Sequence, residues 1–201
     1  MEKEIIDKLI DELKLLIGGK VEKAMLVTWP YLIDDWDKIE FVLNLKITII
    51  SNEFRNITFR MYSDGQTPII VNEKIEYQYE LSELSSRIEQ WKTFDTLPMN
   101  GECYHKYESF NIEYSEEYAG VVGSTIVKVG VYYLQDKKYF FFQKEKPKDP
   151  FGLFLEFSSG KKIWVVCYCD TIWTGNIYPK WIFDDHKKYL KGVRIGQEII
   201  N

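Results

Sequence analysis

The 201-residue chain has only three cysteines, Cys103, Cys167 and Cys169, and only two histidines. An odd number of cysteines without framework spacing argues against a small secreted domain held together by disulfides. No apolar run reaches the roughly 20 residues that a membrane-spanning helix needs. The opening Met-Glu-Lys-Glu leads into a charged amphipathic pattern and does not resemble a signal peptide. We therefore expect a cytoplasmic protein with no membrane partner.

Recognisable catalytic motifs are also missing. The sequence contains no Gly-x-Ser-x-Gly elbow, no His-Glu-x-x-His helix and no glycine-rich phosphate loop. A nucleophilic cysteine would need His105 or His186 as its base, and His186 lies in the hydrophilic run 184–188, which is typical of a solvated face. We predict no cofactor and no catalytic residue, and we favour a non-enzymatic role.

Basic residues are outnumbered by acidic ones. The net charge is −5, and residues 1–100 carry 18 acids against 12 bases, whereas residues 101–201 carry 13 acids against 14 bases. Neutralising phosphates requires a basic surface, so direct nucleic-acid binding is not expected. An acidic protein is better suited to a basic partner, because complementary charge speeds the encounter.

Aromatic residues, by contrast, are abundant at 16% of the chain, and they favour β-sheets. Two stretches, 45–64 and 153–170, resemble each other, and each predicts a strand, a polar turn and a second strand. Aligned from their final aspartates, they share three pairs: Ile57 with Ile163, Tyr62 with Tyr168, and Arg55 with Lys161. We expect a single domain over 1–201, which two related β-rich halves, 1–96 and 97–201, could compose.

The remaining pattern predicts few helices and many strands. An amphipathic helix is expected over 3–17, ended by Gly18-Gly19, and a central helix over 82–94 with Ser82 as its N-cap. Strands are expected at 23–29, 38–50, 54–62, 69–71, 75–79, 107–114, 124–134, 139–143 and 193–200, with a strand, a turn and a second strand over 153–169 and a short helical piece at 184–190. Strands and helices do not alternate, so the fold class is α+β, mostly antiparallel β-sheet with an N-terminal and a central helix.

One combination of residues could hold a metal. Three sulfurs and one imidazole, from Cys103, His105, Cys167 and Cys169, would make an acceptable zinc set if their strands were adjacent. The spacing within each pair is shorter than in zinc knuckles, and 165–169 predicts an interior strand, where cysteine acts as a small hydrophobe. We expect no metal there.

The segment after the first predicted strand is the best candidate for binding a partner. It combines aromatic and acidic residues: Trp29, Tyr31, Asp34, Asp35, Trp36, Asp37 and Glu40. Aromatic anchors ringed by charge are typical of protein interfaces, and an acidic ring suits a basic partner. The alternative is a loop whose tryptophans enter the core. A second group, Trp164, Trp173 and Trp181, is expected to pack in the core and at its corners.

In overall character, an acidic, aromatic-rich, β-dominated protein without catalytic signatures resembles the immunity proteins of bacterial polymorphic toxin systems. The resemblance covers no specific motif, so no functional residue is transferred. It implies a non-catalytic protein that neutralises a basic partner, such as a toxin domain, by tight stoichiometric binding. Trp29 and Trp36 would then supply anchors, with charge from Asp34, Asp35, Asp37 and Glu40.

Two other functions stay open. One is a structural or accessory subunit that pairs through an exposed strand edge or through the first helix, for example as a homodimer. The other is a hydrolase with a dispersed carboxylate site, for which the 31 acidic residues give no reason to select a pair.

Overall fold

The computed structural model describes residues 2–28, 42–49, 54–61, 67–94, 107–136, 149–168, 171–189 and 193–201. The described residues form three α-helices and eleven strands in two sheets, so the predicted α+β class with mostly antiparallel pairing is confirmed. None of the described helices is long and apolar enough to cross a bilayer.

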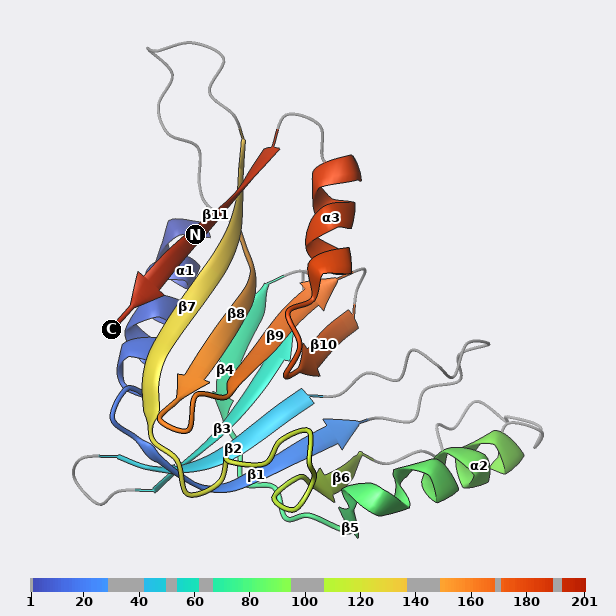
Figure 1. Cartoon of the computed structure of the whole chain (residues 1–201). Helices are drawn as coiled ribbons and strands as arrows, with labels where there is room; N and C mark the ends of the chain where they lie inside the picture. The colour runs from blue at the N-terminus through green and yellow to red at the C-terminus, as the bar shows by residue number, and fades with distance from the viewer. Residues whose placement is uncertain are drawn as a thin grey trace, which may run out of the picture.

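The elements follow the chain in the order drawn in Figure 1. The first part contains α1 (Glu2–Lys14), β1 (Lys20–Thr28), β2 (Val42–Thr48), β3 (Phe54–Met61), β4 (Pro68–Asn72), β5 (Tyr79–Glu80), the short 3-10 helix η2 (Leu81–Glu83), α2 (Leu84–Phe94) and β6 (Glu108–Asn111). The second part contains β7 (Ile126–Asp136), β8 (Asp149–Phe157), β9 (Lys162–Tyr168), β10 (Thr171–Gly175), α3 (Lys180–Tyr189) and β11 (Val193–Ile200).

The two sheets share one connectivity. The first sheet has the order β4-β3-β2-β1-β6-β5, and the second has the order β10-β9-β8-β7-β11. In each, four strands form an antiparallel meander, and the strand after a later helix returns to pair antiparallel with the first strand of the meander. In the first sheet an additional strand, β5, comes between the meander and this helix and pairs parallel with β6. Two related halves would give this arrangement, although their common origin stays a hypothesis. The expected boundary between the halves, at residues 96 and 97, lies outside the described residues.

The sheets are joined where β1 and β7 begin. The amide of Ile126 donates to the carbonyl of Gly19 at 2.9 Å, and the amide of Val21 donates to the carbonyl of Ser124 at 2.9 Å. Between these bonds Lys20 and Thr125 form an isolated antiparallel bridge. The first strand of each meander therefore starts from the same corner, from which the two sheets diverge (Figure 1).

The inner faces of the two sheets enclose the main core. Strands β2 and β3 approach β10, and β4 approaches β8 and β9. The first sheet contributes Val21, Ala24, Leu26, Leu43, Leu45, Ile47, Ile57 and Phe59, and the second contributes Val129, Val131, Leu153, Leu155, Phe157, Ile163, Val165, Cys167 and Ile172. Helix α1 adds Leu9 and Leu13, and Leu16 follows in the turn after it. Burying these aliphatic and aromatic groups is the main stabilising contribution.

The two similar stretches occupy equivalent places. In the first, β2 and β3 pair with Leu45 opposite Ile57, and in the second, β8 and β9 pair with Leu155 opposite Ile163. All four side chains are buried in the core. The alternation of apolar and polar residues fixed both registers, because a one-residue slip would turn these side chains to the other face.

Several expected elements differ from those observed. The expected strand at 75–79 pairs only at Tyr79–Glu80, because the segment 73–78 crosses to β6 and exchanges isolated bonds with Asn56 and Ser109. Strand β10 was not expected. The cap of the second helical region is Glu80, which precedes η2, and not Ser82. The expected strand 139–143 lies outside the described residues.

Helix α3 covers part of the outer face of the second sheet. Phe151, Val166, Ile182 and Phe183 form a second buried cluster, against which Tyr132, Leu134, Trp164, Tyr168, Trp173 and Ile195 pack. His186 also belongs here: its ring centroid lies 4.6 Å from that of Phe151 and 5.5 Å from that of Tyr168. The expectation of a solvated His186 is wrong, because the run 184–188 is amphipathic and one of its faces meets the sheet.

The His186 environment makes a prediction about pH. Burial lowers the pKa of His186, and the nearby Asp185 carboxylate opposes this only in part. A histidine with a lowered folded-state pKa stabilises the fold above its unfolded pKa of about 6.5, and this contribution is lost as pH falls below that value. Between pH 7.5 and 5.5 we expect the wild-type protein to lose up to about 1 kcal/mol more of its free energy of unfolding than His186→Gln.

Urea unfolding of both proteins at the two pH values measures this difference. His105, the other histidine, is present in both proteins, so its titration cancels. Equal losses of stability in the two proteins would contradict the prediction.

Candidate functional site

The residues predicted to bind a partner, from Trp29 to Glu40, lie outside the described residues. They connect two described positions, Thr28 at the end of β1 and Val42 at the start of β2. Their role stays a prediction. Of the zinc combination only Cys167 is described, and it is buried in the core between the sheets, as expected for an interior strand.

Among the described residues, a different surface brings aromatic and acidic side chains together. It is built by two segments, 76–83 and 111–116, which meet because the short strand β5 runs parallel to β6 with Glu80 opposite Asn111. Where the two segments meet there is a hollow of about 350 Å³, lined by Glu80, Leu81, Ser82, Asn111, Tyr114 and Ser115. Glu83, Glu113 and Glu116 flank these residues in the chain and are exposed. We call the hollow and these three glutamates the acidic groove.

Asn111 connects the two segments of the groove through its side-chain hydrogen bonds. It is only 7% exposed, and its side-chain oxygen accepts a hydrogen bond from the backbone amide of Glu113 at 3.1 Å. Its side-chain nitrogen points to Oε1 of Glu80 at 3.5 Å. The backbone amide of Glu80 donates to Oε1 of Glu83 at 3.0 Å, as in a capping box. The carboxylates of Glu80 and Glu83 are therefore positioned by the local backbone.

Tyr114 is the most exposed large side chain of the groove, with 80% of its surface accessible. It follows directly after Glu113 in the turn beyond β6. A tyrosine ring offers a large contact area at a small cost in conformational entropy, which makes an exposed tyrosine a good anchor for a protein partner.

The charge of the groove is not neutralised by the described residues. The segments 75–86 and 107–123 contain seven glutamates and no lysine or arginine. Two of the seven have ion-pair partners: Glu76 contacts Lys74 at 2.9 Å, which lowers the pKa of Glu76, and Glu108 contacts Arg87. Glu80, Glu83, Glu113 and Glu116 make no ion pair with a described lysine or arginine.

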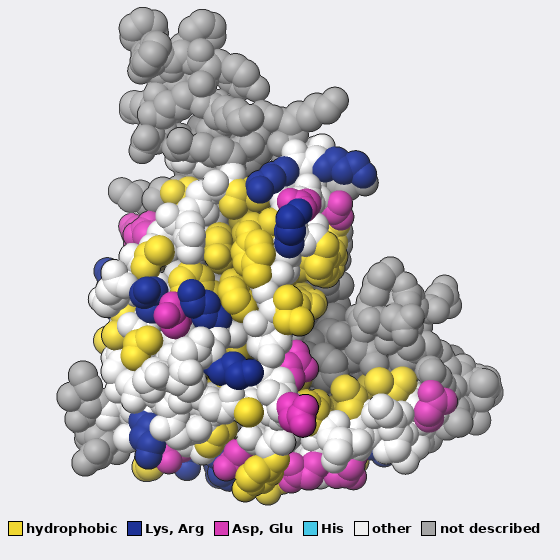
Figure 2. Space-filling view, viewed as in Figure 1, with side chains coloured by type: hydrophobic (Ala, Val, Ile, Leu, Met, Phe, Trp, Pro, Cys, Tyr) yellow, Lys and Arg dark blue, Asp and Glu magenta, His cyan; other side chains and the backbone are white. Residues whose placement is uncertain are grey.

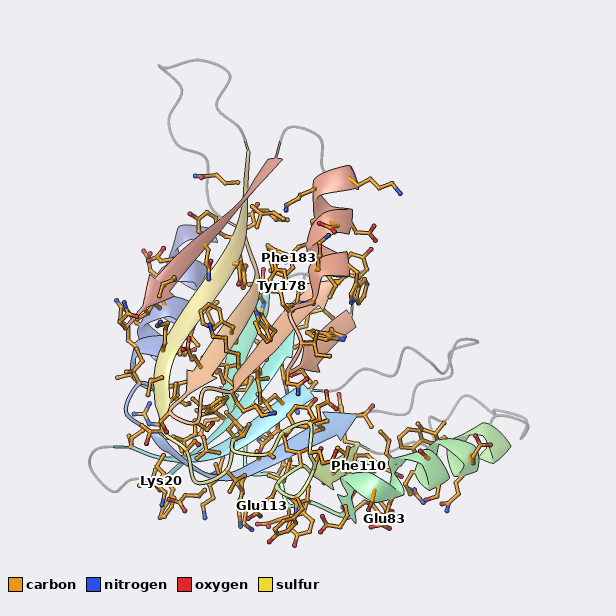
Figure 3. All side chains as sticks on the ribbon, viewed as in Figure 1. Lys20, Glu83, Phe110, Glu113, Tyr178 and Phe183 are labelled. Atoms are coloured by element: carbon orange, nitrogen blue, oxygen red, sulfur yellow. The ribbon has the colours of Figure 1, made fainter. Side chains whose placement is uncertain are left out.

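The acidic side chains are visible on the surface. Figure 2 shows Asp and Glu side chains along the lower margin of the molecule, below β1 and β6 and toward the start of α2. Figure 3 labels Glu113 and Glu83 on this margin, on the side of the first sheet away from α3. The carboxylates give this margin a negative electrostatic potential. The described residues contain no group of three or more metal-ligating side chains.

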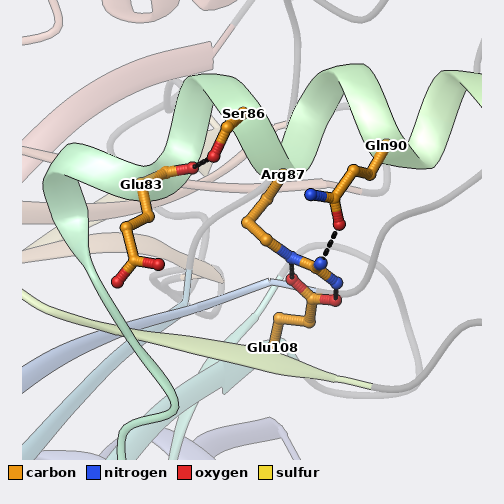
Figure 4. Close-up of polar contacts among 5 residues, drawn as sticks. All are labelled: Glu83, Ser86, Arg87, Gln90 and Glu108. Carbon is orange, nitrogen blue, oxygen red and sulfur yellow. Dashed lines mark hydrogen bonds and ion pairs between the residues drawn. The ribbon is translucent and has the colours of Figure 1, made fainter.

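Helix α2 is fixed beside the groove by a half-buried ion pair (Figure 4). The guanidinium of Arg87 meets the Glu108 carboxylate with two nitrogens, and its Nε donates to Oε2 at 2.9 Å. The hydrogen bond to Glu108 raises the pKa of Arg87, although burial opposes the shift. The same guanidinium lies over the Tyr79 ring, 4.6 Å from its centroid, and donates to Gln90.

An aromatic contact supports this ion pair. Trp91 of α2 is buried and meets Phe110 of β6 edge to face, with ring centroids 6.4 Å apart. Tyr79 of β5 also packs against Phe110, with ring centroids 5.7 Å apart. The groove therefore lies beside a junction at which β5, β6 and α2 pack together.

The second aromatic group departs from expectation at one residue. Trp164 and Trp173 pack against the cluster under α3, as expected. Trp181 is 55% exposed and its ring meets that of Tyr168 in a T-shaped contact, so Trp181 packs at the surface and not in the core.

The acidic groove was not predicted from the sequence. A signal was present, because 107–123 contains four glutamates and three tyrosines without any lysine or arginine. The sequence does not indicate that this segment would meet Glu80, since that contact depends on a two-residue parallel pairing.

Comparisons of the chain with protein-family models, with curated proteins and with solved structures gave no match.

The ion pair beside the groove can be tested. Glu108→Gln leaves the Arg87 guanidinium in a half-buried site without its counter-charge, so we expect the free energy of unfolding to fall by about 1–3 kcal/mol. Ser85→Ala, at an exposed position of α2, is the matched control. Urea unfolding of the three proteins makes the measurement, and equal stabilities of Glu108→Gln and the control would show that the pair does not hold α2.

Proposed function

We propose that the protein is a non-catalytic binding protein that neutralises a basic protein partner by stoichiometric association, as immunity proteins neutralise toxins. The observation that carries the proposal is the acidic groove: Glu80 and the exposed Tyr114 line its hollow, and three exposed glutamates flank the lining residues in the chain without an ion pair to a described residue. The predicted segment from Trp29 to Glu40 has the same composition.

Electrostatics would act at two stages of such binding. At a distance, the uncompensated carboxylates attract a basic surface and raise the association rate. At contact, a lysine or arginine side chain that enters the hollow meets Glu80 and the hydroxyls of Ser82 and Ser115. Charge-assisted hydrogen bonds of this kind are stronger than neutral ones.

Tyr114 would supply the apolar part of the interface. Interfaces take most of their binding energy from a few aromatic or arginine residues, and the surrounding contacts exclude water. A basic enzyme whose active site lies under this surface loses access to its substrate without any chemistry by the inhibitor.

A charge-reversal experiment tests the proposal. The tagged protein captures partners from the lysate of its native host at low and at high salt, and a 1:1 complex is then reconstituted from the purified partner. We expect a basic partner whose dissociation constant rises roughly tenfold or more in Glu113→Lys/Glu116→Lys. High salt should weaken the wild-type complex, because exposed charges are screened.

The matched control is Asp7→Lys/Asp11→Lys, which makes the same change of charge at two exposed positions of α1. A partner that loses affinity equally for both variants responds to net charge alone, and a partner that binds both as tightly as the wild type does not use the groove. Either result contradicts the proposal. Tyr114→Ala tests the anchor separately, with an expected loss of at least fivefold in affinity.

A further inference from the structure

The acidic groove is too small to form a tight protein interface by itself. It consists of six lining residues and three flanking glutamates, whereas a stable interface takes roughly 20–30 residues, or about 800 Å², from each partner. A partner that binds in the groove must therefore also contact a neighbouring surface. The charge of the surfaces on its two sides indicates which one.

On one side of the groove, the face of the first sheet that points away from the core carries lysines. Strand β1 pairs with β6 beside the groove, and Lys23 of β1 lies directly opposite Lys46 of β2. Both lysines attract the Glu76 carboxylate and help to lower its pKa, but that carboxylate is already paired with Lys74 at 2.9 Å. A basic partner would be repelled here, because like charges across an interface are unfavourable.

On the other side, the loop that carries Glu116 reaches the turn between β10 and α3. The backbone carbonyl of Glu117, the next residue, accepts a hydrogen bond from the side-chain amide of Asn176 and another from Nζ of Lys161 at 3.2 Å. Ile177 follows Asn176 in the chain. The acidic groove is therefore contiguous with this turn of the second sheet.

The turn presents apolar side chains to solvent on a fixed support. Ile177 is 74% exposed and Tyr178 is 43% exposed, and we call these two residues the apolar turn. The Tyr178 ring stacks on Phe183, with centroids 4.9 Å apart, and meets Trp164 edge to face at 6.0 Å. Figure 3 labels Tyr178 and Phe183, and Figure 2 shows hydrophobic side chains gathered over the second sheet, with acidic side chains just below them. Contiguous exposed apolar side chains are typical of interaction sites.

The lysines near the apolar turn are paired within the chain. Lys162 and Lys128 contact Glu156 at 3.0 and 3.7 Å, and Lys180 is paired with Asp184. A basic partner is therefore repelled less on this side than on the lysine-bearing face of the first sheet.

We infer that the basic partner of the acidic groove also covers the apolar turn, by placing an apolar side chain against Ile177 and Tyr178. This inference rests on the proposed function and specifies its partner. The partner is a basic protein that presents an aliphatic or aromatic side chain next to the lysine or arginine that enters the groove. Exposed charges mainly set the rate and orientation of association, whereas a buried aromatic or aliphatic anchor supplies affinity.

A substitution that adds negative charge separates these two contributions. The variant Ile177→Asp is titrated by calorimetry, as the full chain, with the purified basic partner from the salt-dependent capture. If charge alone determined the affinity, an added carboxylate would leave it unchanged or strengthen it. We expect instead that the dissociation constant rises roughly tenfold or more, because the carboxylate is buried against an apolar group of the partner.

The matched control is Leu15→Asp, which makes the same kind of change at a 53% exposed leucine. Leu15 follows α1, which Figure 1 places away from α3, and we expect this variant to bind within about twofold of wild type. Ile177→Ser removes the apolar group without adding charge, and we expect a loss of about threefold or more. Circular dichroism confirms that each variant is folded.

The combined results distinguish this inference from the proposed function. Weaker binding by both Glu113→Lys/Glu116→Lys and Ile177→Asp supports the two together. If the lysine variant binds more weakly but Ile177→Asp binds like Leu15→Asp, the proposed function stands and the inference is overturned. If no basic partner binds, or if binding depends on Ile177 but not on the glutamates, both are overturned.

Discussion

The structure depends on one apolar interface, the contact between the inner faces of its two sheets. Each sheet alone would expose one face of leucine, isoleucine, valine and phenylalanine, and neither would be stable in water. The corner at which β1 and β7 begin keeps these faces together, through hydrogen bonds between Gly19 and Ile126 and between Val21 and Ser124. Helix α1 closes the core with Leu9 and Leu13.

Because the core occupies the inner faces, residues that can act on other molecules are left at turns, edges and outer faces. The helices lie at different places on the two sheets, although the sheets share the same meander. In the second sheet, α3 lies on the outer face and buries Phe151 and Phe183. In the first, α2 is held at the β5–β6 edge by Arg87, Glu108 and Trp91. This difference leaves room beside β6 for the acidic groove.

The sequence predicted the features that depend on local pattern. The fold class, the two similar hairpins and the last strand at 193–200 followed from alternation and turn residues, which one stretch of chain determines. Features that depend on distant contacts were not predictable. Strand β10 is short and its pattern is mixed, His186 is half-buried only because α3 meets the sheet, and Glu80 meets Asn111 across some 30 residues of chain. Sequence pattern carries little information about such pairings.

The acidic groove belongs to the first sheet alone, although both sheets contain the same antiparallel meander. Its lining residues come from two segments that meet because β5 adds to the first sheet beyond β6 and runs parallel to it. In the second sheet β11 is the outermost of the described strands, so no described strand forms an equivalent pairing there. The feature on which the proposed function depends is therefore the one by which the first sheet departs from the connectivity that the two sheets share.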